Sequence, residues 1–150
     1  MTPYSIPIYR VALVRDPAAT TGRRLPVTDG RTAATVIMDY LKGVDREHCV
    51  VLMLDAKNRI IGINTVSTGN LTSSMVHPRE VFKPAILSNA AAIIIAHNHP
   101  SDDTDPSPED NKLTKRLKEA GALLGITLLD HIIICDMADK YYSYADRGTL

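Results

Sequence analysis

Short apolar runs of strand length, separated by amphipathic stretches, constrain most strongly what this chain can fold into. The run at 90–96 is continuously apolar, which is typical of a strand buried on both faces of a sheet. Similar runs occupy 49–55 and 126–135, and helix-like patterns lie between them. Because helices and strands alternate around a hairpin, the sequence predicts an α/β (α+β) domain with a mixed β-sheet flanked by helices.

The expected order is strand, helix, strand, strand, helix, strand, helix, strand, strand. The expected strands are 5–14, 49–55, 59–66, 90–96, 126–135 and 140–144, and the expected helices are 32–42, 77–89 and 107–121. Polar stretches at 15–30 and 67–74 are expected loops, and 55–58 is the expected hairpin turn. Gly43 and Gly121 stand where helix C-caps belong, while Pro84 predicts a kink or an early break.

Length and charge limit the classes of protein to consider. The chain has 150 residues, which predicts a single domain at 1–150 with residues 1–30 as an N-terminal strand and loop extension. Its formal net charge is zero, whereas a protein that grips phosphates usually carries an excess of Lys and Arg. A nucleic-acid partner is therefore possible but unsupported by charge.

The cysteines and the hydropathy pattern indicate the compartment. Cys49 and Cys135 lie far apart within apolar runs, so we expect buried thiols outside any disulfide. The sequence shows no signal peptide and no apolar run long enough to cross a membrane. We therefore expect a cytoplasmic protein with no membrane partner.

Two histidines follow the buried run at 90–96 and suggest a metal site. His97 and His99 are two residues apart, so on extended backbone their side chains point to the same side. Asp110 stands at the third position of the next expected helix, from which its carboxylate can reach back. Three such ligands leave a fourth tetrahedral position open, as in catalytic zinc sites. Alternatively, Ser107 and Asp110 form only a helix capping box, and the histidine pair is a solvated loop.

Hydrolysis at such a site needs a general base, and a carboxylate is the usual choice. Glu47 directly precedes the run at 49–55, and Glu80 lies in the first turn of the expected second helix. Spacing alone places neither of them beside the metal.

These residues resemble the RadC family, which carries the JAMM (MPN-type) metalloprotease motif. That motif is His-x-His, seven residues, Ser, two residues, Asp, and His97, His99, Ser107 and Asp110 match this spacing in full. Further blocks that resemble the family are 54–58, 76–83 and 129–133, so the resemblance covers most of the chain beyond residue 30. Full-length members usually add an N-terminal helix-hairpin-helix region, so we expect this chain to be a domain-only member.

The resemblance implies a curved mixed sheet flanked by helices, with one zinc ion held by His97, His99 and Asp110. It also implies that Ser107 helps to hold a tetrahedral oxyanion and that Glu47, ranked above Glu80, is the catalytic glutamate that acts as general base and proton shuttle. One departure is Asp102, which replaces a glycine of the family motif.

The implied function is a zinc-dependent metallohydrolase, of the peptidase or isopeptidase type, that cleaves an amide bond with zinc-activated water. The substrate would be a protein or peptide of unknown identity, and the oligomeric state stays open. The alternative is a RadC-type accessory or binding module in DNA repair or recombination, without hydrolysis. His131 is either a core histidine or a support for the metal ligands.

Overall fold

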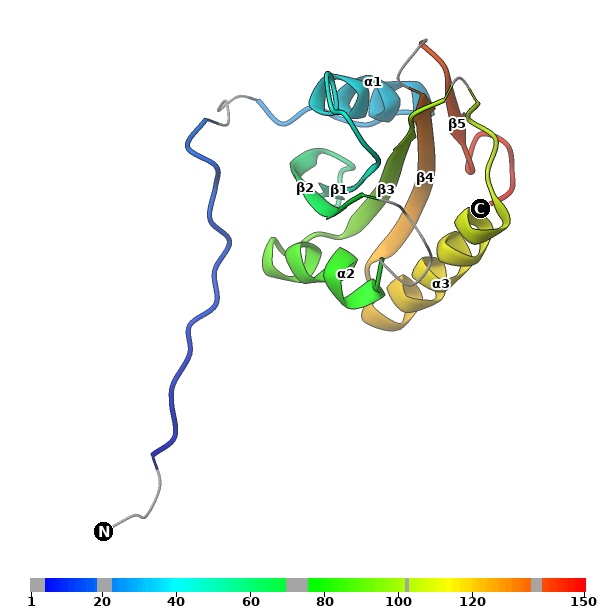
Figure 1. Cartoon of the computed structure of the whole chain (residues 1–150). Helices are drawn as coiled ribbons and strands as arrows, with labels where there is room; N and C mark the ends of the chain where they lie inside the picture. The colour runs from blue at the N-terminus through cyan, green and yellow to red at the C-terminus, as the bar shows by residue number, and fades with distance from the viewer. Residues whose placement is uncertain (1–4, 19–22, 70–75, 102, 136–138) are drawn as a thin grey trace.

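The fold is a mixed sheet flanked by helices, as the sequence predicted, and the described sheet has five strands (Figure 1). The computed structural model describes residues 5–18, 23–69, 76–101, 103–135 and 139–150. Along the chain the elements are α1 (Gly30–Tyr40), β1 (His48–Leu54), β2 (Ile60–Thr68), α2 (Pro78–Leu87), β3 (Ala92–His99), α3 (Pro108–Leu124), β4 (Thr127–Cys135) and β5 (Tyr141–Ser143). The strands lie in the order β2-β1-β3-β4-β5, and only the neighbours β3 and β4 are parallel.

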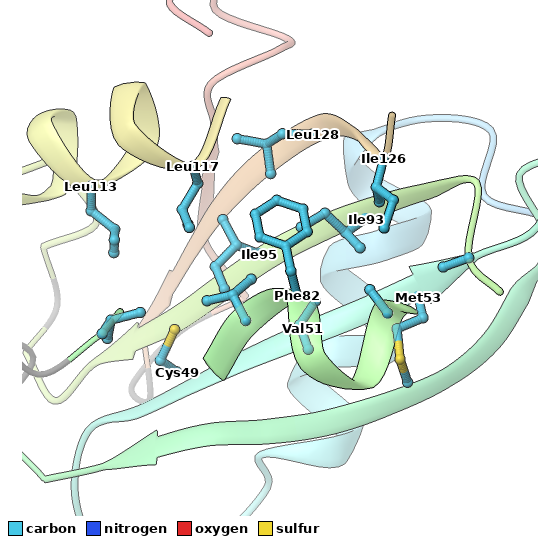
Figure 2. Packing of buried hydrophobic residues seen from close by; sticks show 14 residues of the cluster. Cys49, Val51, Met53, Phe82, Ile93, Ile95, Leu113, Leu117, Ile126 and Leu128 are labelled. Atoms are coloured by element: carbon cyan, nitrogen blue, oxygen red, sulfur yellow. The ribbon is translucent and has the colours of Figure 1, made fainter. Parts of the chain in front are cut away.

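Two apolar clusters hold the helices on opposite faces of the sheet. One cluster packs α2 and α3 on the sheet through side chains such as Phe82 and Leu117, which contact Ile95 and its neighbours in the core (Figure 2). The other packs α1 on the opposite face through Ile37 and small alanines. Burial of aliphatic surface, at roughly 25 cal/mol per Å², therefore fixes both layers against the central strands.

The hairpin between β1 and β2 forms where the sequence predicted it. Asn58 adopts a positive φ of 54° and donates its N–H to the carbonyl of Asp55 at 2.9 Å. The Asp55 carboxylate accepts the backbone N–H groups of Lys57 and Arg59, at 2.9 and 3.0 Å. These bonds lower the pKa of Asp55 to about 2, chiefly through the backbone bond from Arg59. A local carboxylate thus stabilises this turn.

The expected strand at 5–14 is wrong. Residues 5–14 pair with no strand, and their apolar side chains are exposed. Alternation predicts the ability to form a strand, but a strand also needs a neighbouring edge, which the pattern does not supply. The expected loop at 67–74 is wrong at its start, because β2 continues to Thr68, and residues 70–74 lie outside the described residues.

The ends of the helices correct three further expectations. Helix α3 runs past Gly121 to Leu124 and is capped by Gly125 at φ 72°. Gly121 is buried, and a Cβ there would collide with the carbonyl of Ile126, so this glycine serves packing rather than capping. Helix α2 continues through Pro84 to Leu87, so no early break occurs. Leu41, not Gly43, caps α1.

The lengths and apolar character of the helices show whether any of them could cross a membrane. Within the described ranges, no helix combines the length and apolar character needed to cross a bilayer.

Candidate metal centre

The end of β3 carries both histidines on one side of the sheet. The strand runs through His99 instead of ending at residue 96, so the two imidazoles belong to the strand itself. His97 is buried and His99 is partly buried, and both stand next to the start of α3. Residues two apart on a strand share a face, which is why the sequence alone could place the two rings together.

Asp110 reaches the histidines from the first turn of α3. The Ser107 hydroxyl accepts the Asp110 N–H at 3.1 Å, and the Asp110 carboxylate accepts the Ser107 N–H through Oδ2 at 2.9 Å. This is a complete capping box, yet the other oxygen, Oδ1, faces His97. The capping box and the position of Asp110 as a possible metal ligand are therefore compatible in the same arrangement.

Donor atoms of three residues, including both carboxylate oxygens of Asp110, lie near the separations expected around a tetrahedral metal. Nε2 of His97 lies 3.1 Å from Nε2 of His99 and 3.2 Å from Oδ1 of Asp110, and Nε2 of His99 lies 3.5 Å from Oδ2 of Asp110. Ligands about 2.0–2.1 Å from a tetrahedral zinc stand about 3.3 Å from one another. The three residues could thus hold a metal ion, with one position left for another ligand.

The local charges favour a cation at this point. Burial alone would raise the pKa of Asp110, but contacts with His97 and His99 hold that pKa below its ordinary value. The interaction with Asp110 raises the pKa of His99, against the opposing effect of burial. A buried carboxylate that faces two ring nitrogens is stabilised either by protons on those rings or by a metal ion that replaces the protons.

A backbone carbonyl orients His99. Its Nδ1 lies 2.8 Å from the carbonyl oxygen of Asp103. Because a carbonyl only accepts, Nδ1 must carry the hydrogen, and Nε2 of His99 is left to face Asp110. Asp103 therefore acts through its main chain, and its negative side chain is exposed.

A chain of buried hydrogen bonds orients His97 in the same way. The Thr114 hydroxyl donates to the carbonyl of Asp110 at 2.7 Å, so it must accept from Nδ1 of His131 at 2.6 Å. Burial lowers the pKa of His131 well below its ordinary value, so this ring is neutral and its Nε2 is an acceptor. Nδ1 of His97, 2.9 Å away, must then donate to it.

This chain has a direct consequence for the metal site. With hydrogen fixed on Nδ1, the Nε2 lone pair of His97 is available for a cation. His131 is therefore both a buried core residue, stacked on Tyr144 with ring centroids 5.0 Å apart, and a support for the ligand His97. In the sequence His131 is recognisable only as a histidine inside an apolar run, and that pattern does not reveal that its partner is His97.

Asn98, between the two histidines, forms side-chain hydrogen bonds to the backbone at the start of β1. Its side chain points away from the ligands, accepts the N–H of His48 at 2.7 Å and donates to the carbonyl of Arg46 at 3.1 Å. These two bonds bridge the backbone on either side of Glu47. The sequence pattern did not reveal this role, because the middle residue of His-x-His gives no spacing signal.

Glu47 lies on the site's side of the molecule. Cys49 pairs with His97 across β1 and β3, so Glu47, two residues earlier, stands at the level of His99 in that register. Asp110 does most to raise the pKa of His99, followed by the hydrogen bond to the Asp103 carbonyl, and the charge of Glu47 adds a smaller contribution in the same direction. The other carboxylate, Glu80, pairs with Lys83 at 2.9 Å on α2. Thus an electrostatic link to the ligands is found for Glu47.

Both cysteines are buried, as predicted. Burial raises the pKa of Cys49 to about 12, with a smaller contribution from the nearby Asp110 charge. The Cys49 thiol is thus protonated and inert beside the three ligands. Asp102, which replaces a glycine of the family motif, lies outside the described residues.

Fold and site together define the class: an α/β domain that brings two strand histidines and a helix-capping aspartate together as a potential metal site. The family model described as RadC-like JAB domain matches residues 27–149. The chain therefore belongs to the RadC-like JAB domain family.

Bacterial relatives extend this likeness. The chain is 50% identical over 133 residues to a UPF0758 protein of Pelobacter propionicus, covering 86% of this chain and 57% of that protein. It is 47% identical over 133 residues to a UPF0758 protein of Moorella thermoacetica, covering 89% of this chain and 57% of that protein. The chain spans about half the length of the curated relatives it matches.

Proposed function

We propose that this chain is a zinc-dependent JAMM-type metallohydrolase that cleaves an amide bond in a protein or peptide. The observation that carries the proposal is the convergence of His97, His99 and Asp110 at tetrahedral ligand spacing. Nitrogen and oxygen donors of this kind suit zinc, and three protein ligands are typical of catalytic rather than structural sites. When bound, zinc supplies Lewis acidity and lowers the pKa of water to roughly 7.

The chain's own residues would supply the proton transfers. Glu47 precedes β1 at the level of His99 and is half-buried, so its carboxylate can take a proton from the attacking water and return it to the leaving amine. The bonds from Asn98 to both sides of Glu47 would fix the backbone that carries this group.

Ser107 would stabilise the developing negative charge. Its oxygen accepts from the Asp110 N–H, so its own hydrogen can be donated toward the open side of the site. A donor held in place before the reaction stabilises an oxyanion without reorganisation, which is how such groups lower a barrier.

The structure gives less support to a nucleic-acid-binding module. A hollow of about 670 Å³ is lined partly by Arg23, Arg24 and Arg59. However, the Asp55 carboxylate pairs with Arg59 at 2.8 Å and with Arg24 at 3.4 Å, which offsets the positive charge. We therefore favour hydrolysis over DNA binding.

Metal content and hydrolysis test the proposal separately. Purified protein should carry one zinc per chain by elemental mass spectrometry, and His97→Ala should lose it. Glu47→Gln should retain zinc yet lose cleavage of fluorogenic peptide and lysine-isopeptide libraries, whereas the matched Glu80→Gln should keep both. Absence of stoichiometric zinc, with no effect of His97→Ala, would overturn the metal site; full activity of Glu47→Gln would overturn the role of Glu47.

A further inference from the structure

The C-terminal segment places an aromatic residue behind the metal centre. Tyr144 directly follows β5 and is 2% exposed. Its ring stacks on the ring of His131, with centroids 5.0 Å apart and planes 7° from parallel. Its backbone N–H donates to the carbonyl of His131 at 3.1 Å. The main chain and the side chain of Tyr144 therefore both lie against the residue that supports His97.

One buried carboxylate holds the turn that carries Tyr144. Asp130 accepts the Ser143 hydroxyl through Oδ2 and the N–H of Ala145 through Oδ1, the latter at 2.9 Å. The same Oδ1 accepts the N–H of His131 at 2.8 Å. Because Ser143 and Ala145 flank Tyr144, these bonds fix the backbone on both sides of it. The place of the ring over His131 is thus set by the main chain as well as by stacking.

The hydroxyl of Tyr144 reaches the first turn of α3, which lies beside the C-terminal segment (Figure 1). It donates to Oδ1 of Asn111 at 2.8 Å, since an amide oxygen only accepts. Asn111 directly follows the ligand Asp110, and its N–H donates to the carbonyl of Ser107 at 3.1 Å. Burial raises the pKa of Tyr144 to about 12, against the opposing effect of the nearby Thr114 hydroxyl. Tyr144 therefore bonds to the same helical turn that carries Asp110.

These contacts join two layers of the molecule that share one metal site. His97 belongs to the sheet, whereas Asp110 belongs to α3. Apolar packing between such layers has no preferred direction, but a hydrogen bond fixes both a distance and an angle. The bond between Thr114 and His131, at 2.6 Å, joins the layers at one point. A second bond, from Tyr144, opposes rotation of the helix about that point.

We propose that Tyr144 is a positioning residue of the metal centre. Its ring backs His131, and its hydroxyl acts through Asn111 to hold Asp110 at ligand distance from His97. Tyr144 itself touches no reacting atom. The inference rests on the metal site of the proposed function and not on hydrolysis.

The first test is the zinc affinity of folded variants, measured by competition with a chromophoric chelator. Tyr144→Phe keeps the ring and removes the hydroxyl. It should weaken zinc binding by about tenfold, the lower end of the loss seen when an outer hydrogen-bond partner is removed. The matched control Tyr142→Phe removes a hydroxyl that bonds to Thr149 at 3.0 Å and should leave the affinity unchanged. Equal affinities of folded Tyr144→Phe and the wild type would overturn the proposal.

The second test asks whether the bond to Asn111 carries the effect. Asn111→Ala removes the acceptor, so the double variant with Tyr144→Phe should bind zinc no more weakly than Tyr144→Phe alone. Fully additive losses would contradict a link through Asn111. Bound Co²⁺ reports the ligand geometry directly, and its visible absorption should change in Tyr144→Phe but not in Tyr142→Phe. An unchanged cobalt spectrum in Tyr144→Phe would contradict a positioning role.

The third test needs no metal. In the metal-free protein the Asp110 N–H is bonded to the Ser107 hydroxyl at 3.1 Å. Tyr144→Phe should make this N–H exchange with water several-fold faster by NMR, because the first turn of α3 loses its tie, whereas Tyr142→Phe should not. A wild type that binds no zinc would overturn the proposed function, and the exchange rates would still decide whether Tyr144 holds Asp110. Equal rates in Tyr144→Phe and the wild type would show that it does not.

Discussion

Replacement of His131 by Phe tests how the metal ligands are prepared. Phe keeps an aromatic ring against Tyr144, where the two rings stack at 5.0 Å, but it removes the acceptor for Nδ1 of His97. The buried N–H of His97 then has no partner in this chain of bonds. An unsatisfied buried donor costs about 1–3 kcal/mol, so we expect the free energy of unfolding to fall by that amount.

The effect on zinc affinity should be similar in size to the effect on folding and should be measured separately from it. Loss of a hydrogen-bond partner behind a ligating histidine typically weakens metal affinity by about 10–100-fold. At about 1.4 kcal/mol per tenfold, this is roughly 1.4–2.8 kcal/mol of binding free energy. His131→Gln offers a side-chain oxygen that can accept from His97, so this variant should recover most of the affinity.

The assay is competition for zinc with a chromophoric chelator, alongside thermal unfolding of the metal-free proteins. Long-range nitrogen NMR of the zinc-loaded wild type should show hydrogen on Nδ1 of His97 and metal on Nε2. If folded His131→Phe bound zinc as tightly as the wild type, the hydrogen-bond chain through Thr114 would not be what prepares His97. Zinc on Nδ1 would refute the deduced direction of the bonds.

The remaining predictions concern one position each. Asn98→Ala should retain zinc but lower kcat of any cleavage found in the library screen, because the backbone around Glu47 loses its two side-chain bonds; an unchanged kcat would contradict this role. Gly121→Ala should lower the free energy of unfolding by about 1–3 kcal/mol in urea titrations, since the added Cβ meets a backbone carbonyl, whereas an open helix position would gain stability. Asp55→Asn should lower the melting temperature at pH 7. Because bonds from Arg59 and Lys57 depress the pKa of Asp55 from 3.8 to about 2, its stabilisation is full only well above pH 3.8 and is lost as the pH falls toward 2. The difference in melting temperature between the two proteins should therefore close in acid, and a constant difference would exclude the carboxylate charge as its cause.

Much of the site followed from local rules of geometry. The i, i+2 spacing of His97 and His99 determined that the two rings share a face, and the Ser107 to Asp110 spacing determined a capping box. Both rules act within a few residues, so they hold whatever the rest of the chain does. The same is true of the turn at Asp55, where the carboxylate bonds its own loop.

Contacts between distant segments were beyond such rules. Nothing in the spacing shows that His131 of β4 lies behind His97 of β3, because that contact depends on the parallel pairing of the two strands. Likewise, the hydrogen bonds from Asn98 to the backbone at the start of β1 depend on the antiparallel register of β1 and β3. That register brings together residues separated by 50 and by 52 positions in the sequence. Gly121 was predicted to end the helix because glycine is common at helix C-caps. Its actual role, a close approach to the carbonyl of Ile126, depends on a tertiary contact that the sequence pattern does not show.

The amino-acid sequence by itself determined the five strands of the sheet, the three helices, the ligand types and their local spacing, since these depend on periodicity and on backbone geometry over a few residues. The tertiary structure alone decided which ring nitrogen of His97 faces Asp110, which backbone Asn98 holds, and that the strand-like arm at 5–14 finds no neighbour in the described sheet. The physical reason is that hydrogen-bond direction and strand pairing depend on partners supplied by remote segments, and only the folded chain brings those partners within reach.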